Sequence, residues 1–208
     1  MRILVTGASS GIGAALAADL GAQGHEVWTL SRRPGPGHWL TCDLTKPETF
    51  PDIAKALPKL DAVIHSAGIW EATAFSPGYD FATRPVQETL DIIAVNLTAP
   101  ILLTQVLLPN LREGARIVLI GSTSGLDQIG TPEVAYNASK AGLRGAAQAL
   151  QVALKGRHPV TLINPGDVAT ERDAPDLIPV ADVVRVIRLA LDLSPGSYLP
   201  ELTIEPTG

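Results

Sequence analysis

Short apolar runs and longer segments with helical spacing of apolar residues alternate along the whole chain. Each apolar run has the length of a strand and ends in a turn rich in Gly, Ser, Pro or Asp. The runs predict strands at residues 2–5, 26–30, 38–42, 61–65, 116–120, 160–163 and 199–204. Because these runs are short and apolar on both faces, they predict a parallel sheet that is buried between helices.

Helical patterns fill the intervals between the strands. They cover residues 14–20, a short segment ending near 57, and then 86–96, 97–111, 133–155 and 180–193. Thr45 is the expected N-cap of the short helix, with Pro47 in its first turn. No repeat or linker divides the chain, so we expect one α/β domain over residues 1–208. Its doubly wound parallel sheet would have about seven strands and helices on both faces.

The first strand runs directly into a turn with three glycines, and a helix follows. Strand, glycine-rich turn and helix together present unpaired backbone N–H groups and a positive helix end to a phosphate. Gly7 would permit the tight turn, Gly11 the approach of a pyrophosphate, and Gly13 close packing of helix and strand. The hydroxyls of Ser9 and Ser10 add hydrogen-bond donors. A glycine-rich turn without a ligand is the alternative.

Composition narrows the function classes. The chain has 208 residues, of which 46% are hydrophobic and 18% charged, so it can bury a sizeable core. The net charge of −5 argues against a nucleic-acid partner. Cys42 is the only cysteine, which excludes an internal disulfide and a cysteine-built zinc site, and no metal site is expected. A strand begins at once and no apolar run reaches about 18 residues, so we expect no signal peptide, no membrane span and a cytoplasmic location.

The turn after the second strand carries cations where dinucleotide folds that bind NAD usually carry an acid. Ser31 closes the strand, and Arg32 and Arg33 follow. A carboxylate would repel a 2′-phosphate, whereas a guanidinium can pair with it through two hydrogen bonds. The pattern predicts a preference for NADP(H), with two solvated surface arginines as the alternative.

Polar or small residues also follow the third and fourth strands. Asp43 could accept a hydrogen bond from an adenine amino group or cap the next helix. Ser66, Ala67 and Gly68 leave room for a ribose or a ring against the backbone. His65 could be a general base, but a lone His in an apolar strand is more often a hydrogen-bonded structural residue.

Tyr136 and Lys140 are four residues apart in a predicted helix and therefore share one face. The pKa of a free tyrosine, about 10, is too high for ready proton exchange at neutral pH. A neighbouring ammonium lowers that pKa, so the pair predicts an acid/base, with an exposed Tyr and Lys as the alternative. Ser122 after the fifth strand, Asn96 before a long helix and residues 164–166 after the sixth strand favour the first interpretation.

Taken together, these residues resemble the short-chain dehydrogenase/reductase family. They occur in family order over nearly the whole chain. The matching residues are Thr6-Gly7-Ala8-Ser9-Ser10-Gly11-Ile12-Gly13, Asp43-Leu44, Ala67-Gly68, Asn96, Ser122, Tyr136-Asn137-Ala138-Ser139-Lys140 and Pro165-Gly166. The resemblance implies a Rossmann fold and an oxidoreductase that transfers a hydride between NADP(H) and a small carbonyl or alcohol, with NAD(H) as the alternative cofactor.

The resemblance also implies a role for each site residue. Tyr136 would donate the proton in reduction and accept it in oxidation. Lys140 would hold the nicotinamide ribose and lower the tyrosine pKa. Ser122 would orient the substrate oxygen, and Asn96 would hold a water of the proton relay. The implied cofactor contacts are Gly7, Ser9, Ser10, Gly11, Ile12, Gly13, Ser31, Arg32, Asp43, Leu44, Ser66, Ala67, Gly68, Tyr136, Lys140, Pro165, Gly166, and Val168 and Thr170 near the nicotinamide carboxamide.

The chain departs from the family pattern in several places, among them the following. Residues 65–68, His-Ser-Ala-Gly, stand where Asn-Asn-Ala-Gly is usual, which removes any role of the lost Asn. The interval from Ser122 to the tyrosine is one residue longer than usual. Thr123 would fit the shorter spacing, but the position of Gly125 favours Ser122. The substrate lid, residues 167–179, is short, which implies an open site and a loosely specified substrate.

The sequence leaves a second interpretation open for the function and for the oligomeric state. A non-catalytic NAD(P)-binding regulatory protein on the same fold is the alternative function. Small residues along the helix at 133–155 predict a homodimer or homotetramer, and packing on its own sheet is the alternative. Trp70, Phe75, Tyr79 and Phe81 could offer an aromatic wall to a substrate.

Overall fold

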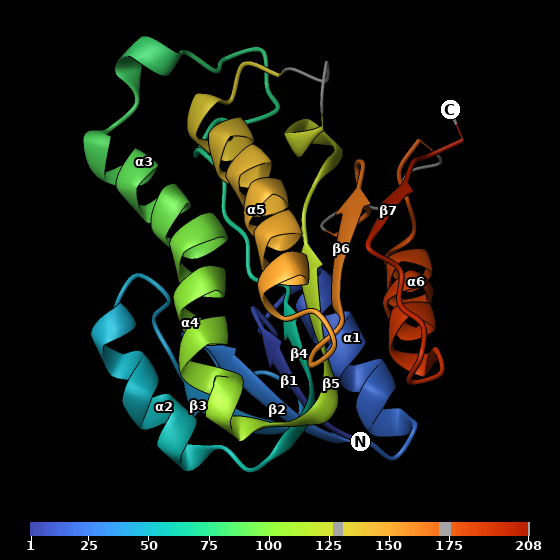
Figure 1. Cartoon of the computed structure of the whole chain (residues 1–208). Helices are drawn as coiled ribbons and strands as arrows, with labels where there is room; N and C mark the ends of the chain where they lie inside the picture. Colours follow the sequence, from blue (N-terminus) through green and yellow to red (C-terminus); the bar gives the residue numbers. More distant parts are fainter. Residues whose placement is uncertain (127–130, 171–175, 208) are drawn as a thin grey trace.

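The strands lie side by side in one parallel sheet. The computed structural model describes residues 1–126, 131–170 and 176–207. Within them the strands are β1 (Arg2–Thr6), β2 (Glu26–Ser31), β3 (His38–Thr41), β4 (Leu60–His65), β5 (Leu111–Ile120), β6 (Val160–Pro165) and β7 (Glu201–Ile204). Their order across the sheet is β3-β2-β1-β4-β5-β6-β7, and each neighbouring pair is parallel (Figure 1). The predicted α/β class and parallel sheet are confirmed.

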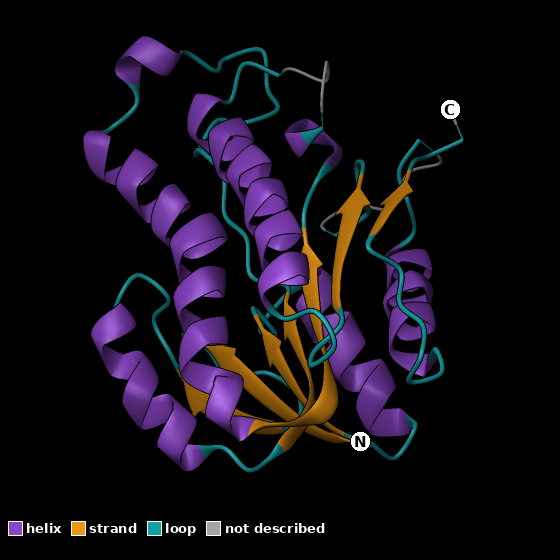
Figure 2. Ribbon diagram, viewed as in Figure 1, coloured by secondary structure: helices purple, strands orange, loops and turns teal. Residues whose placement is uncertain are grey.

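Helices cover both faces of this sheet (Figure 2). One face carries α1 (Gly11–Ala22) and α6 (Val180–Asp192), and the other carries α2 (Phe50–Ala56), α3 (Val86–Ile93), α4 (Ala99–Leu107) and α5 (Val134–Ala153). Successive strand residues point to opposite faces and so enter two apolar cores. Leu4 lies in the core beneath α4 and α5, and its neighbours Ile3 and Val5 lie in the core beneath α1 and α6. The doubly wound arrangement is therefore confirmed as well.

The strand order reverses at β1, and this determines where a ligand can bind. The chain adds β2 and β3 on one side of β1 and then crosses to β4 on the other. The helices that leave β1 and β4 diverge to opposite faces, which opens the carboxyl edge between these strands. The carboxyl ends of β1, β4, β5 and β6 all point toward the same edge of the sheet (Figure 1).

The structure joins the two predicted helices at 86–96 and 97–111 into one. α3 passes through a π-helical turn at Ala94–Thr98 directly into α4. Pro100 has no N–H to bond the carbonyl four residues earlier, and the wider turn accommodates this. Leu111 was expected in the helix and instead begins β5, where it pairs with β4.

The helical segment Val86–Asn110 is long and apolar enough to cross a membrane, with a mean hydropathy of 1.8, and it is the one such helix in the described part of the chain. A single helix of this kind is weak evidence, because the core helix of a globular domain passes the same test. Leu103 and Leu107 of this segment are fully buried in the core of the sheet. The absence of a membrane partner stays a prediction.

The short helix after β3 starts later than predicted, and Thr45 does not cap it. Thr45 instead donates from its N–H and its Oγ1 to Oδ1 of Asp43, at 3.0 and 2.8 Å. A 3₁₀ turn at Pro47–Thr49 then leads into α2. The prediction was wrong because Asp43 forms a turn of its own, and this turn takes the hydroxyl that would have capped the helix.

Candidate active site

The glycine turn between β1 and α1 has the backbone shape that the sequence predicts. Gly7 and Gly11 have φ angles of +73° and +52°, which favour glycine. A Cβ at Gly7 would lie 2.6 Å from the Cα of Ala67, so the turn packs directly on the residues after β4. A Cβ at Gly13 would lie 2.5 Å from the Gly7 carbonyl oxygen, as close helix–strand packing requires.

The start of α1 has no side-chain cap. Ser10 is the N-cap residue, but its side chain makes no capping hydrogen bond, and no acidic residue lies in the first turn. Ile12 packs its side chain against the core beneath α1. Within the described residues, the N-cap side chain therefore leaves the N–H groups of this first turn uncapped, as a phosphate site beside Ser9 would need.

The loop after β2 borders the glycine turn. A Cβ at Gly35 would collide with the Ala8 carbonyl, so the two turns are in contact. Ser31 is buried, and its hydroxyl donates to the Arg33 carbonyl at 2.5 Å. Arg32 and Arg33 are exposed. Two exposed guanidinium groups thus lie in the loop that contacts the glycine turn.

Asp43 and Leu44 follow β3. The hydrogen bonds from the backbone and side chain of Thr45 hold the pKa of the Asp43 carboxyl below its usual value, and Arg32 adds to this effect. Leu44 packs against the core on the α4 face. The carboxylate therefore forms a turn, and its contact with an adenine stays a prediction.

Ser122 and Tyr136 meet across the carboxyl end of β5. Ser122 precedes the 3₁₀ turn Thr123–Gly125, and its Oγ accepts from the N–H of Ser124 at 3.1 Å. A Cβ at Gly125 would lie 2.7 Å from the carbonyl carbon of Lys140, so this turn packs directly on α5. The Ser122 hydroxyl lies close enough to the Tyr136 phenol to act on its pKa, in the direction opposite to burial. Ser122 thus lies beside the tyrosine, and its role in orienting a substrate oxygen stays a prediction.

Lys140 is buried beside the tyrosine, with 5% of its surface exposed. Its Nζ donates to the carbonyl of Ile120 at 3.0 Å and lies 5.6 Å from the centroid of the Tyr136 ring. A Cβ at Gly68 would lie 3.5 Å from Nζ, so the lysine also borders the segment after β4. Burial lowers the pKa of the Lys140 ammonium to about 8.

The pKa of Tyr136 is raised, which corrects the expectation that Lys140 lowers it. Burial of the phenol is the largest cause, and the charges of Asp167 and Glu71 add to it, while the hydrogen bond with Ser122 acts in the opposite direction. The lysine amine binds a backbone carbonyl and lies over the ring instead of at the hydroxyl. Spacing along the helix predicted the pair correctly but could not show the depth at which it is buried.

Asn96 lies in the π-helical turn and is 1% exposed. Its side chain exchanges two hydrogen bonds with the backbone of Ile69, both of 2.8 Å, and also donates to Oγ of Ser139 at 3.0 Å. The residue therefore joins the segment after β4 to the helices α4 and α5. The structure does not test whether it also holds a water of a proton relay.

His65 is a structural residue, as the second interpretation of the sequence holds. It is 2% exposed, and its Nε2 lies 2.9 Å from Oγ1 of Thr104. Burial lowers its pKa to about 4, so the ring is neutral at pH 7. The next residue differs, because Oγ of Ser66 is buried and has no hydrogen-bond partner in residues 1–126, 131–170 and 176–207.

The segment after β6 lies between the glycine turn and the carboxyl-terminal strand. Pro165 ends β6, and the N–H of Gly166 donates to the carbonyl of Ile204. Val168 packs toward the core on the α1 face. Cγ2 of Thr170 would lie 3.4 Å from a Cβ at Gly11, so this residue borders the glycine turn. Contact of either with a nicotinamide stays a prediction, and residues 171–175 of the expected lid lie outside the described residues.

Two glutamates that the sequence did not single out hold the start of α5. Oε1 of Glu71 accepts from the N–H groups of Ala135 and Tyr136 at 3.0 and 3.3 Å, and thereby caps the helix. Glu133 stands at the N-cap position but caps nothing, and its Oε1 accepts from the N–H of Phe75 at 2.7 Å. Both are buried. No local pattern could reveal Glu71, because its partners are more than sixty residues away along the chain.

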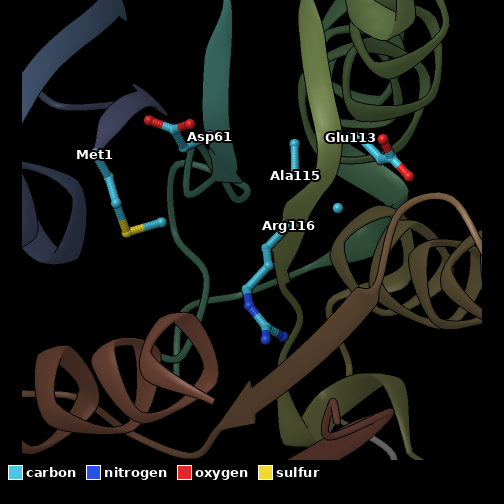
Figure 3. Close-up of a pocket in the computed structure, with 6 residues that line it drawn as sticks. Met1, Asp61, Glu113, Ala115 and Arg116 are labelled. Carbon is cyan, nitrogen blue, oxygen red and sulfur yellow. The ribbon is translucent and has the colours of Figure 1, made fainter. Parts of the chain in front are cut away.

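A cavity of about 340 Å³ lies at the opposite end of the sheet, near the amino ends of β1 and β4 (Figure 3). Two of its charged residues, Arg116 and Asp61, already have protein partners. Arg116 donates to backbone carbonyls of residues 193–197, and Asp61 accepts from the N–H of Arg2. The guanidinium points away from the carboxylates of Asp61 and Glu113 (Figure 3). The chemistry-bearing residues therefore gather at the carboxyl edge, not here.

Comparison with known proteins agrees with this placement. The model of the short chain dehydrogenase family matches residues 1–177. An uncharacterized oxidoreductase of Mycobacterium tuberculosis is 28% identical and covers 94% of this chain and 86% of its own length. Among solved structures, a short chain dehydrogenase from Shigella flexneri 2a complexed with NADP matches with a TM-score of 0.84 and 26% identity, over 97% of this chain and 95% of that one.

A metagenomic short-chain oxidoreductase in complex with NADP matches with a TM-score of 0.82 and 28% identity, over 100% of this chain and 98% of that one. The fold, the glycine turn and the family match thus agree along the chain. The protein belongs to the short-chain dehydrogenase family of NAD(P)-dependent oxidoreductases.

Proposed function

We propose that the protein transfers a hydride between NADP(H) and a small carbonyl or alcohol, with Tyr136 as the general acid/base. The observation that carries this proposal is the cluster of Tyr136, Ser122 and Lys140 at the carboxyl end of β5. A serine hydroxyl close to a half-buried phenol, with a buried amine beside the ring, is an arrangement suited to moving a proton to or from an oxygen.

The residues at this edge fit a dinucleotide. The first turn of α1 offers N–H groups that no side chain caps. Gly7 and Gly68 lack side chains where a Cβ would meet Ala67 or approach the Lys140 amine. The buried Ser66 hydroxyl has no partner in the described residues, as expected of a group that awaits a ligand. Together these residues would hold the pyrophosphate, the ribose and the ring.

The protein's own groups would supply position and the proton. When bound, the nicotinamide supplies or accepts the hydride. Tyr136 keeps its proton at neutral pH because burial raises its pKa, so the acid is ready for the reduction direction. Ser122 would hold the substrate oxygen at the phenol. Lys140, with a pKa of about 8, is mostly protonated at pH 7 and would stabilise the phenolate that remains.

Replacement of the phenol tests this mechanism. Tyr136→Phe should lower kcat roughly 10³-fold, because it removes the proton donor, while the Kd for NADPH changes less than about threefold. Tyr198→Phe is the control, since Tyr198 is an exposed tyrosine far along the chain. Retention of more than roughly a tenth of the activity in Tyr136→Phe would contradict the proposed role. Tight NADPH binding without turnover of any aldehyde or ketone would favour a non-catalytic regulatory protein.

We also propose that NADP(H) is preferred over NAD(H). Arg32 and Arg33 are exposed in the loop that contacts the glycine turn, and no acid stands at the end of β2. Two similar solved structures hold NADP, which supports the proposal. Arg32→Ala should raise the KM for NADPH about tenfold and leave the KM for NADH within about twofold. Equal KM values for the two cofactors in the unmodified protein would remove the proposal.

We propose, finally, a homodimer or homotetramer through α5. Part of its small-residue stripe packs inside the molecule, because a Cβ at Gly142 would lie 2.8 Å from Cδ2 of Leu97. The rest is exposed and apolar: Val134, Ala138, Ala141, Gly145, Ala149 and Val152. Two such helices could approach closely across an interface. A monomer by light scattering at micromolar concentration would end this proposal.

A further inference from the structure

The structure divides the four aromatic residues of the segment after β4 into two groups. Phe75 lies edge-on against the Tyr136 ring, with centroids 5.5 Å apart and planes at 88°. Trp70 lies edge-on against Phe75 at 6.2 Å and 61°. Tyr79 instead uses its hydroxyl to accept from the N–H of Val134. Phe81 begins a 3₁₀ turn and has no ring contact with the described aromatic residues.

Phe75 is half exposed although it contacts the tyrosine, and so is Trp70, which contacts Phe75. Trp70 shows 45% of its surface and Phe75 shows 54%. Rings of this size usually bury their apolar surface. An exposed pair beside the proposed acid/base therefore indicates a surface that binds an apolar part of a ligand. The ring contact continues from Trp70 through Phe75 to Tyr136, and we name these first two residues the aromatic wall.

The backbone holds Phe75 in an unfavourable conformation. Its φ is +59°, and it is the one non-glycine residue with positive φ in residues 1–126, 131–170 and 176–207. The buried carboxylate of Glu133 binds its N–H at 2.7 Å and stabilises that conformation. Non-glycine residues rarely adopt this region, and those that do cluster at functional sites. The backbone conformation and the hydrogen bond to Glu133 therefore fix the position of the Phe75 ring.

Two more glutamates hold the same segment at both sides. Glu71, next to Trp70, binds the first N–H groups of α5. Glu88 of α3 accepts from the N–H of Ala72 at 2.8 Å. The aromatic wall thus stands on a backbone that is tied to two helices, one of which carries Tyr136. A wall fixed in this way can discriminate between substrates by shape.

We propose that the aromatic wall makes the enzyme selective for neutral carbonyl or alcohol substrates with an aryl group next to the reacting carbon. This inference rests on the proposed function, in which the Tyr136 hydroxyl reaches the reacting oxygen. A substituent on that carbon then lies within reach of Phe75, and an aryl ring gains both apolar contact and edge-to-face geometry there. Asp167 and Glu71 bring negative charge to the tyrosine, which disfavours an anionic substituent.

Steady-state kinetics with benzaldehyde and propanal test the selectivity. The unmodified protein should have a kcat/KM at least tenfold higher for benzaldehyde. Phe75→Ala should lower kcat/KM for benzaldehyde about tenfold and that for propanal less than twofold. Phe75→Tyr, which keeps the ring, should retain the preference. Phe81→Ala is the matched control, because that ring is exposed in the same segment but does not contact Tyr136, and it should change neither value.

A binding measurement gives a readout that does not depend on turnover. Benzyl alcohol and 1-propanol are titrated into the NADPH-loaded protein, where no hydride can move, and followed by ligand-detected NMR. The unmodified protein should bind benzyl alcohol at least tenfold more tightly, and Phe75→Ala should abolish the difference. Equal Kd values in the unmodified protein, or an equal loss for both ligands in Phe75→Ala, would overturn the aromatic wall. Failure to bind NADPH, or activity that survives Tyr136→Phe, would instead count against the proposed function.

Discussion

Two buried cations lie along β5, Arg116 in the middle of the strand and Lys140 beside its carboxyl end, and their surroundings differ. Arg116, midway along β5 and level with the amino ends of β4 and β6, is 7% exposed and donates to three carbonyl oxygens of residues 193–197, at 2.6, 2.9 and 3.1 Å. Lys140, at the carboxyl end, is 5% exposed. In the described part of the chain its ammonium has one hydrogen-bond acceptor, the carbonyl of Ile120.

The difference in hydrogen bonding indicates that one cation stabilises the fold and the other takes part in the proposed reaction. The guanidinium of Arg116 donates to three carbonyls of the segment that follows α6, so its buried charge is satisfied by hydrogen bonds. The ammonium of Lys140 gains less from its single bond than it loses by burial, and its pKa falls to about 8. Arg116, toward the amino end of the sheet, therefore stabilises the fold. Burial of Lys140 at the carboxyl end destabilises the fold, which is expected of a residue at an active site.

The largest expected effect is on the structural side of this comparison. Arg116→Met should lower the free energy of unfolding by about 3 kcal/mol, because three carbonyls lose a charged donor in a buried place. Urea denaturation of both proteins measures the change. Arg185→Met is the control, since Arg185 forms an exposed pair with Asp182 on α6 and should cost less than about 0.5 kcal/mol. Equal losses of unfolding free energy in the two variants would show that the hydrogen bonds of Arg116 do not stabilise the fold.

On the chemical side, Lys140→Met should remove turnover yet raise stability at pH 7 by about 2 kcal/mol. The folded pKa of about 8 lies below the ordinary 10.5, so the unfolded chain holds this proton more tightly. Burial of the ammonium then costs about 3 kcal/mol below pH 8, and the lost hydrogen bond offsets about 1 kcal/mol. The cost falls as the pH rises from 8 toward 10.5.

Urea denaturation at pH 7 and pH 10 measures the stability gain of Lys140→Met and its dependence on pH. The gain in Lys140→Met should shrink at pH 10, because the folded-state amine is then neutral and the unfolded chain has begun to lose its proton as well. Lys155→Met, at an exposed lysine near the end of α5, should show no such pH dependence. If Lys140→Met were less stable than the unmodified protein at both pH values, Lys140 would belong with Arg116 as a structural cation.

His65 is a third buried base, and its titration should change the stability by less than that of Lys140. The pKa of His65 is about 4, below the ordinary 6.5, so the unfolded chain gains a proton first as the pH falls. The stability present above pH 6.5 is thus lost toward pH 4, by about 1 kcal/mol between pH 7 and pH 5.5. His65→Asn keeps a partner for Thr104 and should lose about 1 kcal/mol less over that interval. An identical pH dependence in both proteins would mean that His65 does not titrate as a buried neutral ring.

The sequence alone determined the features whose cause is local. Apolar runs predicted the strands, and alternation with helices predicted the parallel sheet, because burial on both faces requires those residues. The spacing of Gly7, Gly11 and Gly13 predicted a turn whose backbone only glycine tolerates. Tyr136 and Lys140 were paired by one helical turn, and Gly125 pointed to Ser122. Each of these inferences depends on neighbours within a few residues, where backbone geometry repeats from protein to protein.

Only the tertiary structure decided the energetic state of the site. Burial, which no spacing reports, raised the pKa of Tyr136 where the sequence predicted a lower value. Glu71 became the cap of α5, and Glu133 the support of Phe75, through contacts between segments far apart in the chain. Desolvation and long-range hydrogen bonds depend on what else is packed nearby, so they exist only once the chain has folded.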